Sequence, residues 1–243
     1  MMKKYLIILL ALTVNLSFGQ KIYKKDLLNL HKKSYKMAIQ NYDLEAAKNS
    51  VYQILAIEGE QSTYQDSLAY IYFNLKNFGS YIVVADKILA KSEKMDLLER
   101  KAIALENLGA IKEAVAVYEK VFAKKKIPIV AYKLGKLQHQ LKRSAEAFAT
   151  LRSMENEKFD TQAYLPFPDA KKGQQQSVPL KAAYMNLLGM VSYDLHSYEM
   201  AIKYFNEALK VYPDFFVAKQ NKSAIEVMIK KLQSKNNAKT PKK

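Results

Sequence analysis

Amphipathic helical segments return in this chain at a nearly constant spacing. Units of two such segments begin near Leu28, Ser62, Met95 and Pro128, which lie 34, 33 and 33 residues apart. A fixed period of this length is typical of helical hairpins stacked into a solenoid, because each hairpin buries its apolar face only against its neighbours. The spacing therefore predicts an all-α fold, an α-solenoid, rather than an accidental run of helices.

The clearest unit runs from Ala182 to Pro213. Its first half places five apolar residues on one helical face and its second half places six more: Tyr184, Leu187, Leu188, Val191 and Leu195, then Tyr198, Ala201, Ile202, Phe205, Ala208 and Leu209. His196 and Ser197 interrupt the pattern, which predicts a tight turn between two antiparallel helices. Gly189 and Ala201 are small where the two helices are expected to touch.

This unit resembles a tetratricopeptide repeat. The resemblance rests on seven residues in register, namely Leu188, Gly189, Ala201, Phe205, Ala208, Leu209 and Pro213. The tryptophan of the family is absent, with Met185 in its place. The resemblance implies about five such units and a C-terminal capping helix. Residues 20–157 would hold four of them, the first two degenerate, and residues 182–233 would hold the fifth with the capping helix.

Two segments depart from the period. Residues 158–181 contain three of the six prolines and a run of glutamines, so we expect an inserted irregular loop there. Tyr164, Leu165 and Phe167 stand among those prolines, which leaves open whether the insertion is functional or only tolerated. Residues 234–243 are basic and almost free of apolar side chains, which predicts a disordered tail.

The first 19 residues have the composition of a secretory signal peptide. Lys3 and Lys4 precede a short apolar run, and Ser17 and Gly19 are the small residues expected before a cleavage site. The run is too short for a membrane span, which takes about 20 apolar residues. We therefore expect export, to the periplasm or beyond, with a mature protein that begins at Gln20. The segment also resembles flavobacterial signal sequences.

The residue types argue against catalysis. The chain has no cysteine, which excludes disulfides, thiolate metal sites and cysteine nucleophiles, and its 7 glycines form no phosphate-binding loop. His31, His139 and His196 lie in three different units, too far apart to share a metal ion in a solenoid. We expect no enzymatic activity, no cofactor and no metal site.

A formal net charge of +16 raises the question of a polyanionic partner. Only three of the 39 basic residues are arginine, and the lysines are interspersed with glutamates along the predicted helices. Readers of nucleic acid depend on arginine for paired contacts, so we do not expect nucleic acid as the partner. After Glu226 the lysines are unopposed, and this basic end is suited to an anionic membrane surface or polymer.

Stacked hairpins leave a concave groove lined by the first helix of each pair. By resemblance to the family, the candidate partner-binding residues are Lys32, Lys36, Tyr70, Phe73, Asn74, Glu99, Glu106, Asn107, Tyr132, Lys136, His139, Asn186 and Tyr193, with Ile103 and Met190 beside them. The lysine and asparagine pattern by which some members clamp a peptide carboxylate is not matched. The function we expect is therefore a scaffold or adaptor that holds a protein or peptide in this groove. The alternative is an envelope-surface protein that binds membrane or polymer through its basic C-terminal helix and tail.

Overall fold

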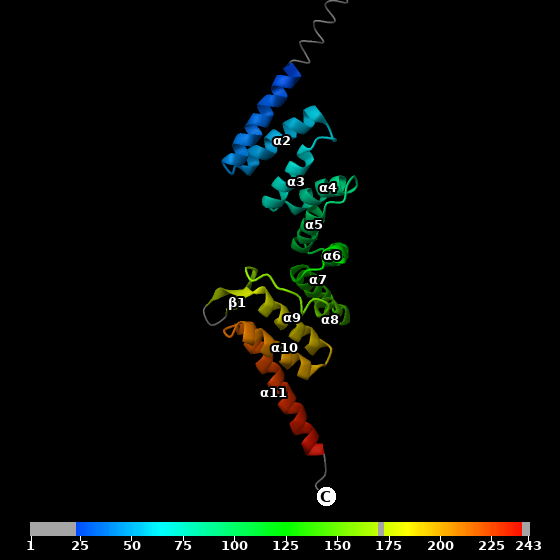
Figure 1. The fold of residues 1–243 in the computed structure, drawn as a ribbon, viewed down its shortest axis with the longest axis vertical. Coiled ribbons are helices and arrows are strands. Elements are labelled where there is room, and N and C mark those ends of the chain that lie inside the picture. The colour runs from blue at the N-terminus through cyan, green and yellow to red at the C-terminus, as the bar shows by residue number, and fades with distance from the viewer. Residues whose placement is uncertain (1–22, 170–172, 240–243) are drawn as a thin grey trace, which may run out of the picture. The chain divides into compact units, whose positions relative to one another are not determined.

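A computed structural model describes residues 23–169 and 173–239 (Figure 1). The chain divides into two compact units, residues 1–109 and residues 110–243, and the division falls inside the third predicted repeat. The described part of the first unit is entirely helical, apart from turns. A helix over residues 23–40 is followed by α2 (Leu44–Glu58), α3 (Tyr64–Asn74), α4 (Phe78–Leu89) and α5 (Met95–Asn107).

The second unit contains α6 (Ile111–Lys124), α7 (Pro128–Gln140), α8 (Ser144–Arg152), β1 (Tyr164–Asp169), β2 (Gln174–Pro179), α9 (Leu180–Asp194), α10 (Tyr198–Val211) and α11 (Phe216–Lys239). In this unit consecutive helices pack against one another, α7 on α8, α9 on α10 and α10 on α11. The expected unit starts at Met95 and Pro128 coincide with the first residues of α5 and α7. The fold is thus a mostly helical solenoid of stacked hairpins, as predicted.

The turn inside each hairpin always has three residues, and the middle one is left-handed. These middle residues are Tyr42, Lys76, Gly109, Lys142 and His196. At Lys76, the backbone N–H donates to the carbonyl of Phe73 at 3.1 Å, and the N–H of Asn77 donates to that of Tyr72 at 2.9 Å. This pair of bonds is a Schellman motif, which satisfies carbonyls at a helix end. The first four left-handed residues lie 34, 33 and 33 positions apart, the period found in the sequence, and the inserted segment lengthens the last interval.

The core of the first unit is built around Tyr81, a fully buried residue of α4. Its hydroxyl donates to the carbonyl oxygen of Leu97 in α5 at 2.9 Å, and its ring meets that of Phe73 edge-on, with ring centroids 5.2 Å apart. Burial raises the pKa of this hydroxyl above its ordinary value. The phenol thus forms a hydrogen bond between α4, the second helix of one hairpin, and α5, the helix that follows it.

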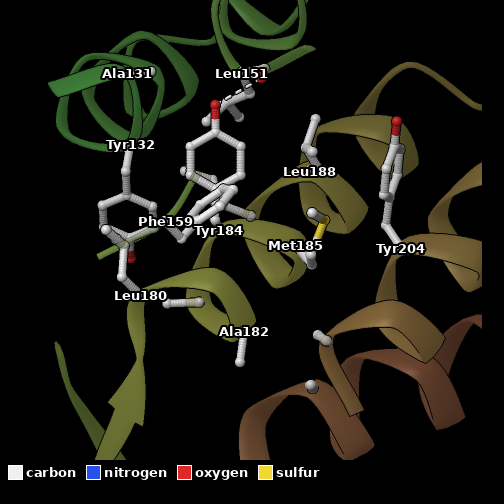
Figure 2. Packing of buried hydrophobic residues seen from close by; sticks show 14 of the residues in the cluster. Ala131, Tyr132, Leu151, Phe159, Leu180, Ala182, Tyr184, Met185, Leu188 and Tyr204 are labelled. Carbon is white, nitrogen blue, oxygen red and sulfur yellow. Dashed lines mark hydrogen bonds between the residues drawn. The ribbon is translucent and has the colours of Figure 1, made fainter. Parts of the chain in front are cut away.

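In the second unit, two glycines let paired helices approach closely. A Cβ atom at Gly189 of α9 would lie 2.5 Å from the ring of Phe205 in α10, and one at Gly135 would lie 2.8 Å from the side chain of Leu151. The contact at Gly189 falls where the sequence predicts a small residue. Beside them, the buried hydroxyl of Tyr184 donates to the carbonyl of Leu151 at 2.6 Å, as Figure 2 shows.

The irregular loop expected over residues 158–181 is wrong, because β1 and β2 form an antiparallel hairpin there. Leu165 and Phe167 are partly buried, whereas Tyr164 and the two prolines of β1 are exposed. This alternation is the period of a strand, and each proline also pushes the residue before it toward extended backbone. Phe167 packs edge-on against Phe215, 4.9 Å between centroids, so the hairpin lies against the base of α11.

The C-terminal tail also differs from the prediction. Helix α11 continues to Lys239, so residues 234–239 are helical rather than disordered. The predicted signal peptide, residues 1–19, lies outside the described residues. No helix of the described part is both long enough and apolar enough to span a membrane.

Candidate binding groove

A cavity of about 340 Å³ opens in the second unit between the first helices of successive hairpins. Helices α7, α9 and α11 supply most of its walls. The lining residues are His139, Lys142, Met190, Tyr193, Asp194, Phe205, Asn221, Ala224 and Ile225. Phe205 and Ile225 are buried, with 1% and 4% of their surface exposed, and they belong to one apolar cluster with Ala201. The cavity therefore has an apolar interior that is bordered by polar side chains.

One wall is held in place by an interaction between α7 and α9. The Nε2 atom of His139 lies 2.8 Å from Oδ2 of Asp194, and both side chains are largely buried. Next to this pair, Lys142 occupies the left-handed position of the α7–α8 turn and is exposed. No ion pair involves the Lys142 ammonium within residues 23–169 and 173–239. The polar wall therefore combines the hydrogen-bonded His139–Asp194 pair with the Lys142 ammonium, which remains available to a partner.

Helix α11 forms the opposite wall. The Nδ2 atom of Asn221 donates to Oδ1 of Asn186 in α9 at 3.0 Å. The Tyr193 hydroxyl points to the Met228 sulfur, 3.8 Å away. These contacts seat α11 beside α9, in the place that the first helix of a further repeat would take. It is thus a structural wall of the groove as well as a cap.

Three of the predicted groove residues in this unit do line the cavity: His139, Met190 and Tyr193. Two predictions are wrong. Tyr132 is only 9% exposed. Its ring centroid lies 6.4 Å from that of Tyr184. Phe159 and Leu180, from the inserted segment, belong to the same core cluster and help to bury it (Figure 2). Asn186 is 2% exposed because α11 lies over it. Lys136 is exposed on α7 but does not line the cavity.

The predicted groove residues of the first unit do not gather around one cavity. Tyr70, Asn74 and Lys36 are exposed, whereas Phe73 packs into the core beside Arg100, whose guanidinium carbon lies 5.6 Å from its ring centroid. The Asn74 amide donates to the carbonyl of Tyr70 on its own helix at 2.8 Å.

The ammonium of Lys32 pairs with Glu58 at 2.6 Å, and this bond raises the pKa of the lysine and lowers that of the glutamate. Glu99, Glu106 and Asn107, with Ile103, lie along α5, and Asn107 donates to the carbonyl of Ile103 at 2.8 Å. The cavity found in this unit is lined instead by the polar loops before α3 and α5, with residues such as Glu60, Ser62 and Lys91.

Sequence reasoning missed six of the residues that line the groove: Lys142, Asp194, Phe205, Asn221, Ala224 and Ile225. A signal for the last three, which belong to α11, was present. Residue Phe216, where α11 begins, lies 34 positions after Ala182, so the repeat period continues into this helix. Extending the period by one more unit would have assigned α11 to the groove-lining set.

Metal-ligating side chains are not clustered in the described part of the chain. Within residues 23–169 and 173–239, no group of three His, Asp or Glu side chains is arranged to hold a metal ion. His139 and Asp194 form a pair, but no serine or threonine hydroxyl lines the cavity beside them. The arrangement is suited to holding an extended chain with an apolar side chain, by burial and hydrogen bonding.

Comparisons with known proteins agree with this geometry. The tetratricopeptide repeat family model matches residues 182–215, which comprise α9 and α10. A tetratricopeptide repeat protein from Parabacteroides merdae ATCC 43184 is similar in structure, with a TM-score of 0.62 and 14% identity over 85% of this chain and 75% of that one.

Two further structures are similar. YrrB, a tetratricopeptide repeat protein described as having an unusual peptide-binding site, matches with a TM-score of 0.61 and 14% identity over 78% of this chain and 88% of that one. MamA matches with a TM-score of 0.58 and 13% identity over 76% of this chain and 92% of that one. No curated protein sequence matches the chain. The chain therefore has the fold of tetratricopeptide repeat proteins, and its residues 182–215 match the sequence model of that family.

Proposed function

We propose that this protein is a non-catalytic scaffold that binds a segment of another protein in the groove between α7, α9 and α11. The observation that carries the proposal is the cavity of about 340 Å³, whose apolar floor is bordered by the His139–Asp194 pair, Lys142 and Asn221. A volume of this size accommodates one or two large side chains. The polar groups around it are placed to bond to the backbone or to an acidic neighbour of the inserted residue.

Tyr193 is the residue best placed to contribute affinity. It is 39% exposed, and its ring packs beside that of Tyr198, 5.8 Å away between centroids, which restricts its freedom before binding. A ring that is already ordered loses little entropy on binding and offers a large apolar area. Lys142 would instead favour an acidic segment and accelerate association.

A peptide selection tests the groove. Peptides selected from a random library on the immobilised protein should be bound at least about tenfold more weakly by Tyr193→Ala, a loss typical of an interface anchor. The matched control is Tyr164→Ala, because Tyr164 is an exposed tyrosine on β1, outside the cavity. Helical content and melting temperature verify that both variants fold. Equal binding by the two variants would mean that the groove between α7, α9 and α11 is not the peptide site.

The cellular setting of the scaffold is also proposed, on sequence grounds. The charged start, short apolar run and small residues of positions 1–19 support export through a cleaved signal peptide. The intact mass of protein recovered from the producing cells should correspond to a chain that starts at Gln20. A mass that retains residues 1–19 would contradict export by this route.

A second candidate function rests on the basic end of α11. After Glu226 the helix carries lysines without an acidic residue between them, at positions 230, 231, 235 and 239. Each lysine near an anionic surface adds about 1 kcal/mol to binding. Co-sedimentation with phosphatidylglycerol vesicles should then fall when residues 230–243 are removed, and vesicles of phosphatidylcholine alone should bind neither form. No difference between the two forms would remove this candidate.

A further inference from the structure

The first helix, residues 23–40, exposes an apolar stripe that the groove proposal does not use. Tyr23, Leu30 and Met37 are 69%, 57% and 54% exposed, and they follow one another at intervals of seven residues. Residues seven apart lie on one side of a helix, two turns apart. The stripe is about 21 Å long at 1.5 Å per residue. Large apolar side chains in such an order mark a surface that is covered in the functional protein.

The opposite side of this helix is already occupied. Ala38 is buried, and Tyr35 packs edge-on against Tyr64 of α3, with ring centroids 5.4 Å apart. The Lys32–Glu58 pair closes the same side against α2. The stripe therefore faces away from α2 and α3, which cover the other side of this helix. A seven-residue apolar spacing is also the pattern by which two helices pair along their length.

We propose that this stripe pairs with the same stripe of a second copy of the chain, in antiparallel orientation. A two-fold axis at Leu30 would set Leu30 against its equivalent and Tyr23 against Met37 of the other copy. One surface then serves both copies, as it does in most symmetric dimers. The proposal concerns the first unit alone and does not depend on peptide binding in the groove of the second.

Charged side chains beside the stripe favour a second copy of the chain as the partner that covers it. Asp26 and Lys33 are both exposed, and they lie on the same flank of the stripe, four residues before Leu30 and three residues after it. Neither makes an ion pair within the described part of the chain. Antiparallel pairing about Leu30 brings Asp26 level with Lys33 of the other copy, twice per dimer. The remaining lysines of the helix, Lys24, Lys25, Lys32 and Lys36, belong to other faces and do not oppose one another there.

The first test is the mass of the purified protein by light scattering across a concentration series. We expect a monomer–dimer equilibrium, and Leu30→Glu should raise the dimer dissociation constant at least about tenfold, because it places two carboxylates at the two-fold axis. The matched control is Val83→Glu, since Val83 of α4 is equally exposed but isolated from the stripe. Helical content and melting temperature verify that both variants fold. A parent that stays monomeric throughout the series overturns the proposal.

A charge exchange tests the antiparallel register. Asp26→Lys alone and Lys33→Asp alone each oppose like charges and should weaken self-association about tenfold. Mixing these two variants should restore a dimer, now formed from one copy of each, because every flank pair is again complementary. If the single variants dimerise as strongly as the parent, or if their mixture dimerises as weakly as each variant alone, the contact lies on another surface. Peptide capture should be the same in Leu30→Glu and the parent, which separates this outcome from any failure of the groove.

Discussion

Asn221 of α11 donates its side-chain amide to the side-chain carbonyl of Asn186 in α9, at 3.0 Å, and Asn186 is almost completely buried. A buried amide without its partner costs more than the bond itself contributes, because the carbonyl has already lost its water. The bond therefore fixes the position of α11, which in turn fixes the width of the cavity beside it.

Removing this bond should loosen the groove wall. We predict that Asn221→Ala destabilises the protein by about 1–3 kcal/mol and increases hydrogen exchange in α11 before the rest of the second unit. The comparison variant is Gln220→Ala, one residue earlier on an exposed position of the same helix. If both substitutions leave exchange in α11 unchanged, other contacts hold the helix.

Gly189 should be intolerant of any side chain. A Cβ atom there would overlap the Phe205 ring, so Gly189→Ala should destabilise by about 1–3 kcal/mol despite the higher helix propensity of alanine. Gly79 in α4 is the control, because no atom lies within 4 Å of its would-be Cβ. Gly79→Ala should stabilise by about 0.5–1 kcal/mol. Chemical denaturation of the two variants measures both signs.

One lysine of the first unit has a left-handed backbone conformation, and replacing it should stabilise the protein. Lys76 has a φ of 57°, a conformation that a side chain disfavours and glycine adopts freely. Lys76→Gly should raise stability by about 0.5–1 kcal/mol, while Gly109→Ala, at the equivalent turn, should lower it by a similar amount. A loss of stability in Lys76→Gly would mean that the lysine side chain contributes contacts that outweigh the backbone strain.

Alkaline pH should lower the stability of the second unit, because this unit buries the phenol of Tyr184. Burial raises the pKa of Tyr184 above its ordinary value, so above pH 10 the unfolded chain loses this proton while the folded chain keeps it. The free energy of unfolding should therefore fall as the pH rises beyond 10, by up to about 1.4 kcal/mol per pH unit for one group. Tyr184→Phe should flatten this dependence relative to the parent. An identical slope in both proteins would assign it to other groups.

The sequence predicts the helical array well, because its period is a property of the chain itself. Met95 and Pro128 begin helices, and Gly135 and Gly189 occupy close contacts, since spacing and residue size dictate both. The groove is predicted less well. A helical pattern separates apolar from polar positions, but Tyr132 and Tyr193 look alike by that criterion. The difference between them depends on Phe159 and Leu180, which belong to the same buried cluster as Tyr132 and come from the inserted segment that the helical period does not describe.

The constant turn inside each hairpin also determines where this protein can change its length. All such turns have three residues, whereas the joins between hairpins vary from three residues between α6 and α7 to the long segment between α8 and α9. One residue added to a turn would disrupt the left-handed conformation that all five turns share at their middle residue, and with it the hydrogen bonds at the helix end. The joins between hairpins vary in length and are therefore the places that accept added residues. The strand pair at residues 164–179 is an addition of that kind, and the same joins are the places where an engineer could insert a loop or a whole domain without disturbing the array.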